Sequence, residues 1–249
     1  MSNRQFILCG LIGLIIIASL TGCAKREGII KIGCAAPITG DQAKIGLDLL
    51  NGVRLAVEEA NQKGEVIPGY KLSVYEQDDQ HNPAQAVSVA KKFIADRDVV
   101  AVVGHLNSSC TKPASSVYYE ARIVQLSPAS TNPEISKQGF DTFFRTCTTD
   151  DVQGPAGAVF AVRKLGVKKV YIIDDRTTYG KGLADEFRKK AEVLGAKILG
   201  HEGITQGDKD FTPLLTKIKA LMPDLIFFGG IYPEGALLIK QARNLDMKC

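Results

Sequence analysis

The sequence predicts an α/β protein built from two doubly wound lobes with a ligand cleft between them. Strand-like apolar runs alternate from residue 29 onward with segments of helical period. The run VVAVVG is apolar throughout, which is typical of a parallel strand covered on both faces. After residue 147 the alternation starts again. Because such alternation is characteristic of Rossmann-like sheets, we expect one sheet in each half of the chain.

The N-terminal lobe is predicted over residues 23–147. Its first helix places apolar residues such as Leu49, Val53 and Val57 on one face. Asn82 and Pro83 are predicted to cap and start the second helix, because Asn accepts bonds from free N–H groups and Pro lacks an N–H to leave unpaired. Strands are expected near residues 29–36, 71–79, 99–104 and 121–127.

The C-terminal lobe is predicted over residues 148–249. The segment FFRTCTTDDVQG, residues 143–154, shows no helical period, so it is predicted as the crossover between the lobes. The remaining elements are predicted as helices at 153–165, 182–194, 211–221 and 234–244, and strands at 168–175, 197–203 and 224–230.

The composition argues against nucleic acid as a partner. The formal net charge is only +4 with interleaved signs, 7% of residues are aromatic and Trp is absent. The sequence therefore lacks both the clustered basic residues and the aromatic stacking residues with which proteins bind nucleic acids. His81, His105 and His201 are scattered, so no metal site is predicted, and the stretch Asp78–His81 is interpreted as a polar loop. No cofactor is expected.

Residues 1–22 are interpreted as a signal peptide. Arg4 is the only charge there, and the apolar run ILCGLIGLIIIASL is short for a membrane span of roughly 20 residues. The following Leu20-Thr21-Gly22-Cys23 resembles the lipobox of bacterial lipoproteins, in which the Cys is lipidated. We therefore expect Cys23 to carry a lipid anchor. An ordinary secretory signal or a short uncleaved anchor is the alternative.

Four further thiols belong to Cys34, Cys110, Cys147 and Cys249. Four cysteines allow three disulfide connectivities, and the sequence does not choose among them. No C-x-x-C occurs, so we interpret them as small buried residues without a redox role.

The stretch GHLNSSCTKPASS, residues 104–116, places five hydroxyls where a strand ends and a helix begins. These hydroxyls could cap the helix. They could instead form an anion site, since a helix start offers free N–H groups and a positive dipole end. The loops PAST and RTTYG follow two other strands and are also rich in hydroxyls. Because ligands of such sheets bind at the carboxyl ends of strands, we expect a polar cleft for a ligand with a negative group.

No catalytic machinery is recognisable, so the chain is not expected to be an enzyme. Neither G-x-S-x-G nor H-E-x-x-H occurs. Adjacent Asp174 and Asp175 on a strand point to opposite faces and make a poor acid/base pair. Gly180-Lys181-Gly182 lacks the rest of a phosphate loop and is interpreted as a turn.

The chain resembles the leucine/isoleucine/valine-binding family of type I periplasmic binding proteins, which serve branched-chain amino acid ABC transporters. The matching stretches are GHLNSSCTKPAS, SPASTNPE, DVQGP, TTYGKGLADEF, GDKDFTPLL and FFGGIYPEGALLIKQAR. They occur in the family's order across nearly all of residues 29–245.

The resemblance implies a set of ligand-binding residues. Hydroxyl and backbone N–H groups of Ser108 and Thr131 would hold the α-carboxylate of an amino acid, and the Ala129 carbonyl would accept from its ammonium group. Tyr179 would cover the ligand from the second lobe. Asp150 would lie near the hinge, although an N-cap role is an equal alternative.

Three departures from the family pattern bear on the pocket and the fold. Ile45 and Ile231 stand where many members have aromatic residues. Several members have a disulfide whose two cysteines would stand at the positions of His81 and Asn107, so the resemblance implies that this disulfide is absent here. Family members also continue past a stretch like LDMKC with a Glu that binds the ammonium group and with elements that complete both lobes, so the resemblance implies a missing C-terminal part.

The resemblance therefore predicts a monomeric lipoprotein on the periplasmic or extracellular face of a bacterial membrane. It would capture a branched-chain or other hydrophobic amino acid and deliver it to an ABC permease. The alternatives are the same fold binding an amide, urea or an aromatic acid, a sensory ligand-binding lobe, or an enzyme whose residues the sequence does not reveal.

Overall fold

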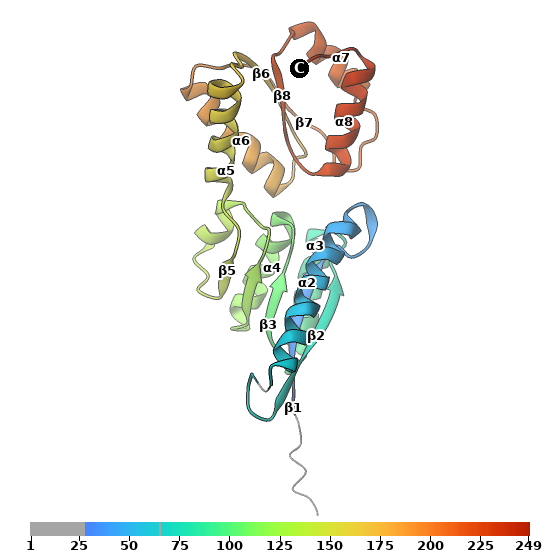
Figure 1. The fold of residues 1–249 in the computed structure, drawn as a ribbon, viewed down its shortest axis with the longest axis vertical. Helices are drawn as coiled ribbons and strands as arrows, with labels where there is room; N and C mark the ends of the chain where they lie inside the picture. The colour runs from blue at the N-terminus through green and yellow to red at the C-terminus, as the bar shows by residue number, and fades with distance from the viewer. Residues whose placement is uncertain (1–27, 65) are drawn as a thin grey trace, which may run out of the picture.

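The computed structural model describes residues 28–64 and 66–249. The predicted signal peptide and Cys23 lie outside these residues. Two α/β lobes are stacked along the long axis of the molecule, with β1 to β5 in one and β6 to β8 in the other (Figure 1). The chain passes from the first lobe to the second between β5 and α5. The predicted fold class is confirmed, whereas the boundary at residues 147/148 stays a prediction.

The first lobe alternates strands and helices as predicted. Its elements are β1 (Gly28–Ala36), η1 (Gly40–Gln42), α2 (Ala43–Gln62), β2 (Tyr70–Asp78), α3 (Pro83–Ala95), β3 (Val99–Gly104), α4 (Ser108–Glu120), β4 (Val124–Ser127), η2 (Pro133–Gln138) and β5 (Phe143–Arg145). The predicted cap of α3 is confirmed, since the Asn82 side chain accepts from the N–H groups of Ala84 and Gln85.

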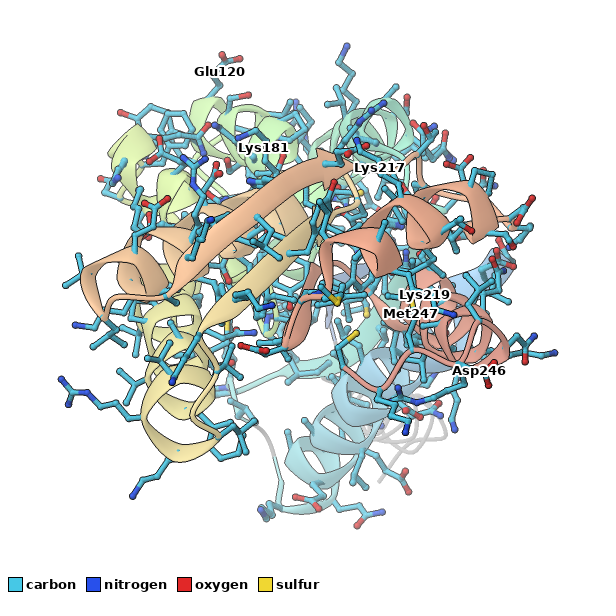
Figure 2. The ribbon with its side chains drawn as sticks, turned by 90° about the horizontal axis from the view of Figure 1, so that it is seen from above. Glu120, Lys181, Lys217, Lys219, Asp246 and Met247 are labelled. Atoms are coloured by element: carbon cyan, nitrogen blue, oxygen red, sulfur yellow. The ribbon has the colours of Figure 1, made fainter. Side chains whose placement is uncertain are left out.

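The second lobe continues the same alternation. Its elements are α5 (Asp150–Val159), η3 (Phe160–Lys164), β6 (Lys169–Asp174), α6 (Thr178–Val193), β7 (Lys197–Gly203), α7 (Thr212–Leu221), β8 (Leu225–Gly229) and α8 (Tyr232–Asn244). The chain after α8 packs back onto this lobe: Met247 is buried, and the Lys219 ammonium of α7 donates to the Leu245 carbonyl at 2.6 Å (Figure 2).

Both sheets are parallel, with strand orders β2-β1-β3-β4-β5 and β7-β6-β8. Each sheet extends in both directions from its first strand, which is the doubly wound topology. The carboxyl ends of the strands in both lobes therefore face the space between the lobes, where the hydroxyl-rich loops lie (Figure 1).

Alternating side chains divide each sheet into two faces. In the first lobe, Ala35 and Val102 join α3 and α4 in one buried apolar cluster. In the second lobe, Val170 and Ile172 pack against α5 and α6, while Tyr171 and Ile173 pack against α7 and α8. Burial of both faces of the second-lobe sheet explains why β6 is almost wholly apolar in sequence.

The predicted crossover over residues 143–154 was wrong in detail. Residues 143–145 form β5, which pairs in parallel with β4, and α5 already begins at Asp150. Only residues 146–149 connect the two elements. A three-residue strand shows too few alternations to be recognised, and the Gly and Pro in DDVQGP obscure a helical period. Gly180 and Gly182 lie in the first turns of α6, so the predicted turn was also wrong.

Cys34, Cys110, Cys147 and Cys249 are all free thiols. Cys34 and Cys110 are buried, as predicted, whereas Cys147 and Cys249 are partly exposed. Burial raises the pKa of Cys34 to about 12, which keeps this thiol protonated and unreactive. Among residues 28–64 and 66–249, no helix is both long and apolar enough to cross a bilayer.

Gly229 permits a close approach of β8 to the start of α6. A Cβ at this position would lie 2.2 Å from the Gly180 carbonyl oxygen and 2.9 Å from Ala184 Cβ. We predict that Gly229→Ala lowers the free energy of unfolding by about 1–3 kcal/mol, because the backbone must shift to admit the methyl group. Urea unfolding measures this change.

Gly52→Ala is the matched control, since a Cβ at this exposed position of α2 meets no atom within 4 Å. It should leave stability unchanged or raise it by about 0.5–1 kcal/mol. Equal stabilities of the two variants would show that the packing of Gly229 on Gly180 is not a constraint.

Candidate functional site

The hydroxyls at the start of α4 are not helix caps. Asn107 occupies the N-cap position, but its side chain makes no capping bond. Ser115 and Ser116 donate to the carbonyls of Lys112 and Pro113, three residues earlier in the same helix. Thr111 donates to the carbonyl of His105, the residue directly after β3. The first turn of α4 therefore keeps backbone donors free of side-chain caps, as an anion site requires.

Ser108 joins the loop after β3 to the loop after β4. Its hydroxyl oxygen accepts from the backbone N–H of Asn132 at 3.3 Å, and the side chain is 2% exposed. Arg145 of β5 supports the second loop, donating to the carbonyls of Ser130 at 2.7 Å and Asn132 at 3.1 Å. The main-chain N–H of Asn132, the residue after Thr131, therefore holds Ser108 close to Thr131.

Thr131 and Asp150 bring unpaired polar atoms together at the junction of the lobes. The Asp150 N–H donates to the Thr131 carbonyl at 2.9 Å. Within the described part of the chain, the Thr131 hydroxyl and both carboxylate oxygens of Asp150 are buried without a hydrogen-bond partner. A buried polar group without a partner costs about 1–3 kcal/mol. Such a cost is typical of a site shaped for a polar ligand.

Burial raises the pKa of Asp150 to about 6. The nearby Thr131 hydroxyl and Arg145 guanidinium both oppose this rise in the pKa of Asp150. The Thr131 hydroxyl acts through proximity, because its geometry does not meet that of a hydrogen bond. Thr149, and not Asp150, occupies the N-cap position of α5. The alternative structural role of Asp150 as a cap is therefore excluded.

Tyr179 lies in the first turn of α6, on the second lobe. Its hydroxyl accepts a hydrogen bond from Gln153 at 3.4 Å. Burial raises its pKa, and the neighbouring Asp150 and Asp175 carboxylates add to the effect. The Asn132 amide donates to the Thr178 carbonyl at 2.6 Å, which ties the first-lobe loop to the residue beside Tyr179. The structure thus brings Ser108, Thr131, Asp150 and Tyr179 to one junction.

Ala129 is exposed at the end of an apolar groove between α2 and the first-lobe sheet. The groove has a volume of about 630 Å³ and includes Ile45. Its other walls include Leu49, Val53 and Val103. Ala129 is therefore near Thr131 in the chain, and it lines this groove.

Sequence reasoning missed the residues that hold the site together. Asn132 bridges the lobes, Arg145 supports its loop and Gln153 contacts Tyr179. Asn132 stands inside the stretch SPASTNPE, so a polar residue directly after Thr131 was the available signal. Gln153 likewise stands inside the stretch DVQGP, whereas nothing in the sequence distinguishes Arg145 from a surface residue.

The model of a family described as periplasmic binding proteins matches residues 29–248. An amino acid binding protein of Pseudomonas aeruginosa is 42% identical over 242 residues, covering 97% of this chain and 64% of the relative. The Leu/Ile/Val-binding protein homolog 1 of Brucella abortus is 39% identical over 245 residues, covering 98% of this chain and 65% of the relative.

Among solved structures, the branched-chain amino acid transporter substrate binding protein LivJ of Streptococcus pneumoniae, in complex with isoleucine, superposes with a TM-score of 0.80. It is 31% identical, and the match covers 88% of this chain and 62% of that protein. The chain therefore spans a little less than two thirds of the length of these relatives.

The raised pKa of Asp150 predicts a pH dependence of stability in the ligand-free protein. Its folded-state pKa of about 6 lies above the value of roughly 4 for an exposed Asp, so the folded protein binds the proton more tightly. The free energy of unfolding should then fall as pH rises from about 4 to 6, by about 2 kcal/mol.

Asp150→Asn should abolish this fall and make the variant more stable than the native chain at pH 7.5 but not at pH 4. Urea unfolding at a series of pH values measures both curves. Asp151→Asn changes the exposed neighbouring carboxyl and is the control. Parallel curves for the Asp150→Asn and native proteins would contradict the assignment of the fall to Asp150.

Proposed function

The chain belongs to the periplasmic binding protein family, and we propose that it captures a branched-chain or other hydrophobic amino acid between its two lobes. The observation that carries the proposal is the pair of buried, unpartnered groups at the lobe junction, the Thr131 hydroxyl and the Asp150 carboxylate. A zwitterion supplies the acceptor and the cation that these two groups need.

The carboxylate of the ligand binds at the start of α4. Ser108 and Thr131 offer hydroxyls, and the first turn of α4 offers backbone N–H groups and the positive end of the helix dipole. Hydrogen bonds to an ionised group are about twice as strong as neutral ones, so a few suffice to orient the ligand.

The ammonium group of the ligand binds the Ala129 carbonyl and the Asp150 carboxylate. An ammonium group taken out of water needs an opposite charge. Asp150 is the residue at the junction with two free carboxylate oxygens among those described. Ammonium binding would lower the pKa of Asp150 from about 6, so at pH 6 binding releases part of a proton.

Tyr179 covers the ligand when the lobes close by a hinge movement at residues 146–149. The ligand is then delivered to an ABC permease, outside the cytoplasm, by a protein held to the membrane through a lipid on Cys23. The relatives are named for binding and not for catalysis, which fits this role. Copies of this chain act as monomers.

We predict that Ser108→Ala and Thr131→Ala each weaken leucine binding by roughly 10- to 100-fold, because each removes a hydrogen bond to a charged group. Isothermal titration calorimetry with leucine, isoleucine and valine provides the affinities. Ser116→Ala is the control, since this hydroxyl bonds only within α4 through Pro113. Native affinity in the Ser108→Ala and Thr131→Ala variants would refute the carboxylate site.

Asp150→Asn should weaken the binding of leucine but not that of isocaproate, the same acid without its amino group. The variant removes the charge that meets the ammonium group and keeps the shape of the side chain. Equal loss for the two ligands would mean that Asp150 only shapes the site. Binding of an aromatic acid or an amide in place of any amino acid would support the alternative ligands.

A further inference from the structure

The two lobes touch at a second place, in addition to the contact between Asn132 and Thr178. Asp41 in η1 meets two residues of the second lobe: the Tyr232 hydroxyl donates to its carbonyl at 2.6 Å, and the Lys209 ammonium lies 3.2 Å from its carboxylate. The Gln206 amide also contacts the His81 ring. We call these five residues the closure contact: Asp41, His81, Gln206, Lys209 and Tyr232.

The closure contact lies at a polar cavity of about 470 Å³ between the lobes. First-lobe residues 39–42 and 80–82 and second-lobe residues 206–207 and 233–234 line it. None of the predicted ligand-binding residues Ser108, Ala129, Thr131, Asp150 and Tyr179 lines it. The contact is therefore separate from the amino acid site.

On the first lobe, a buried side chain connects the closure contact to the carboxylate site. Gln42 directly follows Asp41 and is 3% exposed. Its side-chain oxygen Oε1 accepts from the Asn107 side-chain amide at 2.9 Å, and its side-chain nitrogen Nε2 contacts the His81 ring. Asn107 is the residue before Ser108 and the N-cap residue of α4. The position of η1 and that of the α4 start are thus fixed together.

The loop that carries His81 is anchored to the same region. The buried Asp79 carboxylate accepts from the His81 N–H at 3.0 Å through one oxygen. Its other oxygen lies 2.7 Å from the ring of His105, just before the α4 loop. Both first-lobe parts of the closure contact therefore connect to the loop of Ser108 through buried hydrogen bonds.

On the second lobe, the opposing loop is equally well held. The Gly207 N–H donates to the buried Glu234 carboxylate at 2.9 Å, and the Gln241 amide donates to the Lys209 carbonyl at 2.8 Å. Both partners belong to α8, which also carries Tyr232. The loop that carries Gln206 and Lys209 is therefore held to α8 by two hydrogen bonds.

We propose that the closure contact is an affinity determinant: it stabilises the closed arrangement of the lobes before ligand arrives, and Gln42 links it to the carboxylate site. This inference rests on the proposed function. The apparent affinity of a binding protein equals the affinity of its closed form multiplied by the fraction that is closed. A contact made only between closed lobes therefore tightens binding without touching the ligand.

The double variant Tyr232→Phe, Lys209→Met tests the contact, because it removes the hydroxyl and the charge while keeping side-chain bulk. We expect the radius of gyration of the ligand-free chain, measured by X-ray scattering, to increase. Leucine binding should weaken roughly 3- to 10-fold, the effect of one or two exposed polar contacts. Tyr119→Phe, which alters a tyrosine stacked on Phe140 in the first lobe, should change neither quantity.

An unchanged radius of gyration together with unchanged leucine affinity would overturn the proposal. If the native chain binds no amino acid, the proposed function fails. The scattering comparison of ligand-free proteins still decides whether the closure contact holds the lobes together.

Gln42→Leu tests the link to the carboxylate site. Loss of the bond to Asn107 should weaken leucine binding at least fivefold. Asn107→Leu removes the other partner of the same bond and should weaken leucine binding by a similar factor, so the double variant should bind leucine no more weakly than either single variant. Losses that multiply in the double variant would show that the two residues act independently and would overturn the role of Gln42.

Discussion

The architecture of the candidate site depends on a single peptide carbonyl, that of His105, the residue directly after β3. It accepts from the hydroxyls of Ser127 and Thr111, at 2.8 and 3.1 Å, and the Ser130 hydroxyl, 3.2 Å from it, is hydrogen-bonded to the Thr111 hydroxyl at 2.6 Å. These donors come from α4, from the end of β4 and from the loop beyond it. One acceptor thereby gathers the two loops that present Ser108 and Thr131. The fully buried His105 side chain is fixed in turn by Asp79 and Tyr118.

This arrangement explains why the hydroxyl-rich stretch contains more hydroxyls than a ligand can use. Thr111, Ser127 and Ser130 satisfy one another and the His105 carbonyl, so their polar atoms are buried at little cost. Thr131 and Asp150 lack such partners. The contrast separates residues that build the site from residues that are available to a ligand, although both kinds look alike in sequence.

Local chemistry made much of the fold predictable. The cap at Asn82 and the apolar run of β3 depend on neighbouring residues, and both were confirmed. The grouping of Ser108 with Thr131 followed from the rule for parallel sheets, because both lie beyond the carboxyl ends of adjacent strands. The role of each residue in ligand binding stays a prediction.

Features that depend on long-range geometry were not predictable. The bond between Tyr232 and Asp41 joins residues that are 191 positions apart, and no periodicity reports it. The use of Asn107 as a donor to Gln42, instead of as a cap, is equally invisible in a linear pattern. Short β5 was missed because its three residues acquire strand geometry only through pairing with β4.

The apolar groove along α2 continues toward β5 as an uncovered sheet face. Val103, Leu126 and Phe144 share this face, since they are aligned across three parallel strands. Phe144 is 52% exposed and Val124, on the same face of β4, is 42% exposed. Parallel sheets are normally covered on both faces. Residues 28–249 in isolation should therefore bind hydrophobic dyes such as anilinonaphthalene sulfonate while folded, and be retained by chaperones during expression.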